Sequence, residues 1–286
     1  MKTLWKVVGI SALAFTLAAC NSSAKPTKNT TNKSELTLEQ VYNKAVERQE
    51  NITSASATME MTQHTTAGSG EEAMEFSIDS QMTMDVVVDP MAMHLSGSMS
   101  MSDIAGTGEE PASMPLEMYM DQNKGFFMKD MSSDIWMKFP DSDFDDILAQ
   151  TASSADTKEQ LAQLKPFIND FTFEQTDDAY VLTLEAEGER FKKLIEEEVE
   201  KSMQSVGLGE NPLDQLQIDK IHYIVYIDKK TFDTTKMNMD FDLKMDIEGE
   251  TLAMTTASVI TYTAFNHLKT IDIPQEIIDN ATVIDY

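Results

Sequence analysis

Alternation of apolar and polar residues is the dominant pattern of this chain. Between residues 76 and 88 the even positions include Phe76, Ile78 and Met82, whereas the odd positions are mostly Ser, Thr, Gln or acidic residues. Successive side chains of a β-strand point to opposite sides of a sheet. The pattern therefore predicts a long antiparallel strand with one buried face and one solvated face.

The same alternation returns in several later segments, which lie between short turn signals such as Asp89-Pro90 and Glu248-Gly249-Glu250. These segments cover residues 91–102, 116–121, 180–185, 237–248 and 252–262. In total the sequence contains about eleven candidate strands. Such a set of long alternating strands predicts one large, twisted antiparallel sheet.

Four segments instead carry apolar residues at helical spacing. The first covers residues 36–51, where Thr37 is a suitable N-cap and Asn51 a suitable end. The others cover residues 142–152, 158–169 and 189–205. Strands together with about four helices predict an α+β fold. Because no Pro- or Gly-rich linker separates comparable halves, residues 36–286 are predicted to form a single domain.

The start of the chain predicts a lipoprotein signal. Lys2 and Lys6 precede a short apolar stretch over residues 7–16, which the sequence Leu17-Ala18-Ala19-Cys20 follows. The stretch is too short to span a bilayer, so residues 1–19 are predicted to be a cleaved signal peptide. The four-residue sequence resembles the recognition site of lipoprotein signal peptidase, which implies a diacylglyceryl group on Cys20. We therefore expect a lipid anchor at the extracytoplasmic face of the cell membrane.

The segment that follows the signal, residues 20–35, is rich in Asn, Ser, Thr and Lys and has no large apolar side chain. This composition cannot bury enough surface to fold, so the segment is predicted to be a disordered tether. A flexible chain of this length would place the folded domain roughly 20 Å from the membrane.

Acidic residues outnumber basic ones, with 49 Asp and Glu against 22 Lys and Arg and a formal net charge of −27. Such a surface repels nucleic acid and offers it no basic footprint, which excludes nucleic-acid binding. Cys20 is the only cysteine, so we expect no disulfide. The fold must then depend on its hydrophobic core.

Several segments carry a resemblance to a known family. They are the sequence TLEQVYNKAVE from Thr37, the strand start Ser54-Ala55-Ser56, the residues Tyr262 and Phe265-Asn266, and the segment Ile271-Asp272-Ile273-Pro274. With Cys20 they are similar to uncharacterised Gram-positive cell-surface lipoproteins, whose fold resembles the LolA/LppX lipoprotein-carrier superfamily. The resemblance implies a sheet of about eleven strands curved into a half-open β-barrel, with helices over an apolar concave face that holds acyl chains. It implies a Gram-positive host and brings no catalytic residues.

Methionine is frequent, with 21 residues, and often occurs as Met-x-Met pairs on one side of a predicted strand. Its unbranched, polarisable side chain adapts to irregular apolar partners such as acyl chains. We predict that a Met-rich concave surface binds a lipid or another apolar ligand. The predicted lining residues are Met82, Met84, Met93, Met99, Met101, Met118, Met120, Met237, Met239, Phe241 and Met245. Alternatively, the same side chains fill a core between the sheet and its helices.

Two further functions are compatible with parts of the sequence. Met91, Met93 and His94 are residue types that bind copper, although in a strand His94 points away from the two methionines. His64 is placed in the same way relative to Met59 and Met61. A cell-envelope protein that docks another protein, without a small ligand, is also compatible with the sequence.

An enzyme is not expected from the motifs in the chain. The sequence has neither Gly-x-Ser-x-Gly nor His-Glu-x-x-His. The carboxylates of Asp141, Asp143, Asp145 and Asp146 suit a helix N-terminus better than a Ca²⁺ loop, since the distal Glu and Gly of an EF-hand are missing. We therefore expect no metal and no cofactor.

Overall fold

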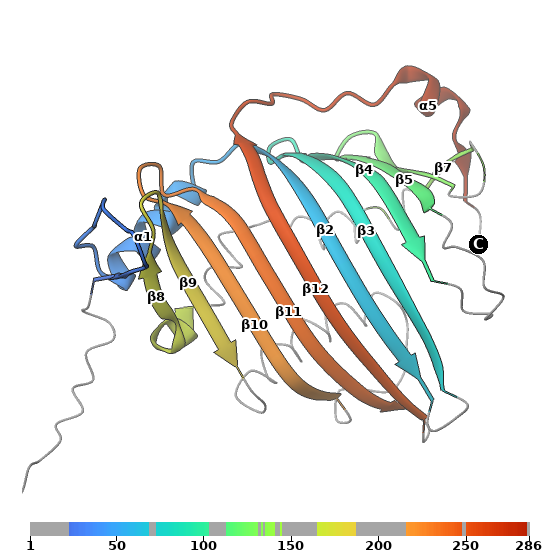
Figure 1. The fold of residues 1–286 in the computed structure, drawn as a ribbon. Helices are drawn as coiled ribbons and strands as arrows, with labels where there is room; N and C mark the ends of the chain where they lie inside the picture. Colours follow the sequence, from blue (N-terminus) through green and yellow to red (C-terminus); the bar gives the residue numbers. More distant parts are fainter. Residues whose placement is uncertain are drawn as a thin grey trace, which may run out of the picture.

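A computed structural model describes residues 23–68, 73–102, 113–130, 133, 135–140, 144, 165–186, 216–247 and 250–284. These residues form one open, curved sheet of thirteen strands (Figure 1). The helices predicted over 142–152, 158–169 and 189–205 lie outside this part, apart from Phe144 and the 3-10 helix η3 (Lys165–Asp170).

The described α-helices are α1 (Leu38–Gln49) and α5 (Gln275–Asn280). The strands are β1 (Lys25–Pro26), β2 (Ser54–Ala67), β3 (Met74–Val87), β4 (Ala92–Met101), β5 (Ser113–Asp121), β6 (Gly125–Lys129), β7 (Trp136–Lys138), β8 (Thr172–Gln175), β9 (Ala179–Ala186), β10 (Leu216–Asp228), β11 (Thr234–Ile247), β12 (Glu250–Phe265) and β13 (Thr282–Val283). The described part is thus mostly β-structure with two α-helices, and the expectation of about four helices is not supported.

The order of strands across the sheet is β1-β8-β9-β10-β11-β12-β2-β3-β4-β5-β6-β7-β13. Neighbours from β8 to β7 in this order pair antiparallel, which confirms the predicted large antiparallel sheet. At the two edges, β1 pairs with β8 and β13 with β7 in parallel. The sheet has thirteen strands instead of about eleven, and a strand of only two residues, such as β1 or β13, is too short to show an alternation in the sequence.

Helix α1 forms where the apolar spacing predicted it. Thr37 and Gln40 make a reciprocal capping box at its start, with Gln40 N–H donating to the Thr37 hydroxyl and Thr37 N–H to the Gln40 side chain. Its buried face packs on strands β9 and β10. The two sides of this core are Leu38, Val41, Tyr42 and Ala45 from the helix and Tyr180, Leu182, Val225 and Ile227 from the strands.

Residues 23–35, predicted as part of a disordered tether, are packed against the edge of the sheet in the structure. Ala24 is only 2% exposed, and β1 pairs with β8. Gln175 on β8 is buried and holds both ends of the segment, since its amide donates to the carbonyls of Ala24 and Ser34 and accepts from the Ser34 N–H. Backbone pairing and a buried amide therefore replace the apolar contacts that the composition lacks. We call residues 23–36 the N-terminal strap.

Helix α5 packs on the opposite side of the sheet from α1. Ile273 and Ile277 are buried against Tyr119 of β5 and Phe127 of β6. The resemblance implied helices over one concave face, whereas α1 and α5 pack on opposite faces of the sheet. The apolar spacing of residues 271, 273 and 277 explains this docking.

Candidate functional site

Register across the sheet defines its two faces, because residues paired on neighbouring strands point to the same side. We call the side on which α1 packs the inner face. One continuous row of paired residues crosses it from β9 to β5: Leu182, Val225, Met237, Ile260, Met59, Met82, Gly97 and Leu116. The opposite side is the outer face.

All eleven residues predicted to line an apolar surface lie on the inner face. Those on β11 are Met237, Met239, Phe241 and Met245; those on β3, β4 and β5 are Met82, Met84, Met93, Met99, Met101, Met118 and Met120. The structure thus brings together side chains that are more than 100 positions apart in the sequence. A period of two in each strand, kept in register between strands, is sufficient to align them.

These eleven side chains differ in burial. Met93, Met120 and Met237 are buried, whereas the other eight are half-buried. Met84, Met93, Met118 and Met120 pack in one core cluster with Val86, Met91 and Phe144, and Phe241 and Met245 pack beside Leu184, Ile218 and Ile221 in another. Met82, Met99, Met101, Met237 and Met239 belong to neither of these described clusters, and all of them except Met237 are half-buried. The two clusters thus leave half-buried methionines between them.

A group of polar side chains lies at the centre of the inner face, on β12, β2 and β3. Ser80, Thr65, Thr256 and Ser258 are each less than 9% exposed, and Gln63 pairs with Thr256. The Gln63 amide donates to the Thr65 hydroxyl at 3.2 Å, and the Ser258 hydroxyl lies 3.5 Å from the Met239 carbonyl. We call these five residues the hydroxyl band.

Sequence reasoning did not include the hydroxyl band in the site. Its signal was present, because Ser80, Thr256 and Ser258 occupy the apolar phase of the alternation in β3 and β12. A buried hydroxyl costs free energy unless it is hydrogen-bonded. The band therefore gives an otherwise apolar face a central set of neutral hydrogen-bonding groups.

No charged residue occupies an inner-face position of the described β2, β3, β4 or β11, and in β12 the charged residue in this phase is Glu250, at the start of the strand opposite Ile247. Tyr223, on the neighbouring β10, donates its hydroxyl to the Met237 sulfur at 3.1 Å. Burial raises the pKa of the Tyr223 phenol, so this group also stays neutral at physiological pH. The central inner face therefore offers apolar contact and neutral hydrogen bonds, without ion pairing.

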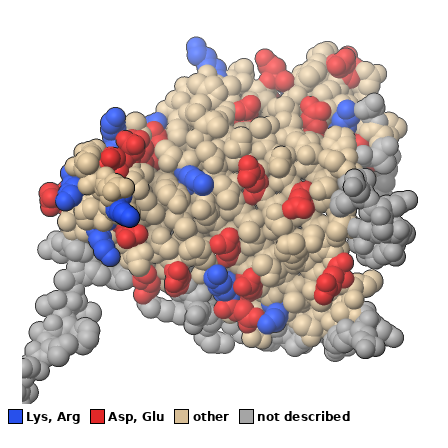
Figure 2. All heavy atoms as spheres, in the orientation of Figure 1, with Lys and Arg blue, Asp and Glu red and all other residues tan. Residues whose placement is uncertain are grey.

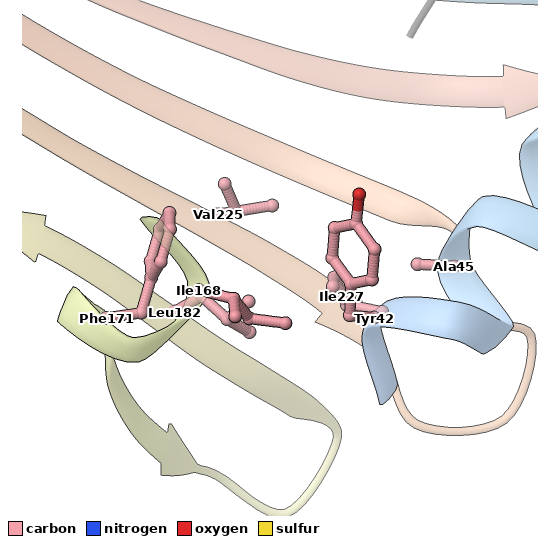
Figure 3. A pocket seen from close by; sticks show the side chains of 7 residues that line it. All are labelled: Tyr42, Ala45, Ile168, Phe171, Leu182, Val225 and Ile227. Carbon is pink, nitrogen blue, oxygen red and sulfur yellow. The ribbon is translucent and has the colours of Figure 1, made fainter. Parts of the chain in front are cut away.

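The crevice beside α1 is too small for a ligand. Figure 3 shows its lining, which comes from α1, from η3 and the residue after it, and from β9 and β10. The lining residues are Tyr42, Ala45, Ile168, Phe171, Leu182, Val225 and Ile227. Its volume is about 10 Å³, close to the minimum for one water molecule. This end of the inner face is a filled core.

His64 and His94 lie on the outer face, as the strand period predicted. His94 stacks on Tyr119 with ring centroids 4.2 Å apart, and its Nε2 lies 3.5 Å from a Glu117 carboxylate oxygen. His64 lies 2.6 Å from the Ser77 hydroxyl. Within the described residues, no group of three or more His, Cys, Asp or Glu side chains could hold a metal ion. The carboxylates of residues 141, 143, 145 and 146 lie outside the described residues.

Charge is distributed unevenly over the molecule. Figure 2 shows acidic side chains scattered over the visible surface, while several Lys and Arg side chains gather at the end that carries α1 and the N-terminal strap. Lys25, Lys28 and Lys33 of the strap are exposed, and Glu35 is its one acidic residue. The described residues contain no helix that is long and apolar enough to cross a bilayer. Cys20 lies outside the described residues.

Comparison with known proteins gives a family and distant structural likenesses. Residues 37–282 match the model of a family of unknown function, DUF6612, and no curated protein matches the chain. Lipovitellin, in a structure titled for its lipid–protein interactions, is 6% identical with a TM-score of 0.33; the match covers 78% of this chain and 26% of lipovitellin, so this chain spans about a quarter of it.

Two further solved structures are similar. A β-barrel-like DUF1849 protein from Brucella abortus is 11% identical, with a TM-score of 0.22 and coverage of 74% of this chain and 98% of that one. A DUF1329 protein from Desulfovibrio piger is 12% identical, with a TM-score of 0.16 and coverage of 81% and 95%. At these scores the likenesses carry no argument about the function of this chain.

Proposed function

This chain belongs to the DUF6612 family of unknown function, and we propose that it is a non-catalytic, membrane-anchored lipoprotein that binds a lipid or another apolar ligand on the inner face of its sheet. The observation that carries the proposal is the continuous, uncharged row of inner-face residues from β9 to β5. Large contiguous apolar surfaces of this kind usually serve binding.

The half-buried methionines suit an acyl chain better than a rigid ligand. Met82, Met99, Met101 and Met239 keep part of their side chains accessible, and each has three rotatable bonds with which to follow an irregular apolar partner. The hydroxyl band lies between the apolar ends of the same face. An amphipathic lipid can therefore place its hydrocarbon on methionine and its ester or hydroxyl groups at the centre.

The lipid anchor on Cys20 completes the proposal. Residues 21 and 22 separate Cys20 from the strap, and a fully extended chain spans about 3.6 Å per residue. A strap docked on the sheet would then hold the domain within about 11 Å of the anchor, closer than a flexible tether would. The exposed Lys25, Lys28 and Lys33 would face the bilayer surface, where each lysine contributes about 1 kcal/mol of attraction to anionic lipid.

The test uses the whole chain with Cys20→Ala, which removes the anchor. We expect this variant to leave the membrane fraction and to retain a lipid that organic extraction and mass spectrometry detect. Met82→Lys and Met239→Lys should each lower the bound lipid at least about tenfold, because each places a charge on the uncharged face. Thr83→Lys, at the next position on the outer face, is the matched control and should retain the lipid.

Three results would contradict the proposal. If the Cys20→Ala chain stayed attached to the membrane, a lipid on Cys20 would not be its anchor. Equal lipid content in the Met82→Lys and Thr83→Lys proteins would exclude the inner face as the binding surface. Purification with a stoichiometric protein partner and without lipid would favour a docking function instead.

A further inference from the structure

A second concave site lies on the outer face, between α5 and strands β5, β6 and β7. Its volume is about 440 Å³, within the range of about 300–1,000 Å³ that is usual for small-molecule sites. We call it the outer groove. Its lining residues are Glu117, Tyr119, Lys129, Trp136, Pro274, Glu276, Ile277 and Asn280.

The walls of the outer groove are fixed from both sides. Ile277 of α5 is buried in the cluster that contains Tyr119, and Trp136 packs against the same cluster. Beyond the helix, β13 pairs with β7, with Thr282 opposite Met137. The segment that forms one wall is thus held by a buried core at one end and by strand pairing at the other. These contacts hold the groove in a defined shape.

Aromatic rings form one side of the groove. Tyr119 and Trp136 lie 5.7 Å apart between centroids, with their planes inclined by 46°. Tyr119 is 9% exposed, and His94 covers one of its ring faces in a parallel stack. Trp136 is half-buried, so the indole is the larger accessible aromatic surface.

Polar groups of both kinds surround these rings. Glu117 and Glu276 supply carboxylate acceptors, whereas Lys129 and Asn280 carry N–H donors. Burial, together with the neighbouring Glu117, raises the pKa of the Tyr119 phenol, which therefore remains protonated. A ligand in this groove meets a flat apolar surface and a rim that can both donate and accept hydrogen bonds.

We propose that the outer groove binds the sugar rings of a glycan. A pyranose ring has a C–H face that packs on an aromatic plane and hydroxyl groups that both donate and accept, which matches this lining. An ammonium ligand fits less well, because the face of Tyr119 covered by His94 cannot help enclose it and Lys129 would repel it. The charged lining is equally unsuited to a hydrocarbon chain.

Trp136 provides a direct reporter of the groove. The chain has two tryptophans, Trp5 and Trp136, so the whole chain with Trp5→Phe and Cys20→Ala emits from Trp136 alone. We expect a saturable change in its emission with at least one of three probes: maltotriose, cellotriose and the β-1,4-linked trimer of N-acetylglucosamine. Each is titrated to about 10 mM, enough to fill most of a site with a Kd near 1 mM.

Calorimetry on variants locates the binding. Trp136→Leu should weaken the responding sugar at least about tenfold, a loss of about 1.4 kcal/mol. Glu276→Gln, at an exposed position, should weaken it several-fold without changing the unfolding transition. Tyr226→Leu, which removes an outer-face aromatic beside Lys236 and outside the groove, is the matched control and should bind normally.

Three results would overturn the proposal: no response to any of the three sugars, a saturable response to choline chloride in their place, or unchanged sugar affinity in both groove variants. None of them bears on lipid binding by the inner face, since the two sites lie on opposite sides of the sheet. The proposals for the two faces are therefore tested independently.

Discussion

Two regions of the same inner face differ in how deeply their side chains are buried. Beside α1, Tyr180, Leu182 and Val225 are at most 5% exposed and form a filled core. At the centre, Met82 and Met239 are half-buried. There the hydroxyl band occupies positions that are apolar elsewhere in the same alternation. One sequence pattern therefore produces a packed core at one end and a partly accessible surface at the centre. Stability and ligand binding should depend on different parts of this face.

The largest expected effect separates the two regions by stability. Leu182→Ala removes a buried side chain from the core beside α1 and should lower the free energy of unfolding by about 2–5 kcal/mol. Met239→Ala should cost about 1 kcal/mol, because part of that side chain already contacts water. Denaturant unfolding of the two variants measures the difference, and equal losses would show that the centre is packed as firmly as the α1 end.

The next effect concerns the N-terminal strap, which is joined to the core beside α1. Gln175→Ala leaves the Ala24 and Ser34 backbone groups without their amide partner and should lower stability by about 1–3 kcal/mol. Hydrogen exchange of residues 23–36 should accelerate at the same time. Glu174→Ala, one position away on β8, is the control. Unchanged exchange in the Gln175→Ala protein would show that the strap does not depend on this amide.

A smaller effect is expected in the hydroxyl band. Thr256→Val replaces an inner-face hydroxyl by a methyl group and should change the free energy of unfolding by no more than about 1 kcal/mol. It should shift the bound lipids towards species with fewer polar groups, as mass spectrometry of extracted lipid would show. Thr255→Val, at the next and outward-facing position, should leave the lipid profile unchanged. The same profile in both variants would argue against contact between lipid and the band.

The smallest effect is the acid sensitivity of the strap. The Thr31 and Asn32 N–H groups donate to the Asp177 carboxylate and hold its pKa below the ordinary value of 3.8. A lowered pKa in the folded state stabilises the fold above the ordinary pKa, and this stabilisation is lost as the pH falls through the folded-state pKa. Asp177→Asn should therefore reduce the slope of stability against pH in the acid range. Asp178→Asn is the comparison, and an equal change in slope would contradict the assignment.

Local periodicity explains what could be predicted from the sequence. The two methionines of a Met-x-Met pair lie on the same side of their strand. Eleven inner-face residues could therefore be named before the pairing of the strands was known. The strap was not predicted as folded, because its contacts are backbone pairs and one distant amide, Gln175. The outer groove joins residues 117–136 to residues 274–280. No local pattern reports a contact between segments so far apart in the chain.

The two short edge strands have a consequence for how copies of this protein behave beside one another. The backbone groups at the edge of an open sheet can pair with another chain and start edge-to-edge polymerisation. Here β1 covers the edge strand β8, and β13 covers β7, each with only two residues. Pro26 in β1 has no backbone N–H to offer a further strand. Neighbouring copies should therefore remain separate molecules even at high local concentration.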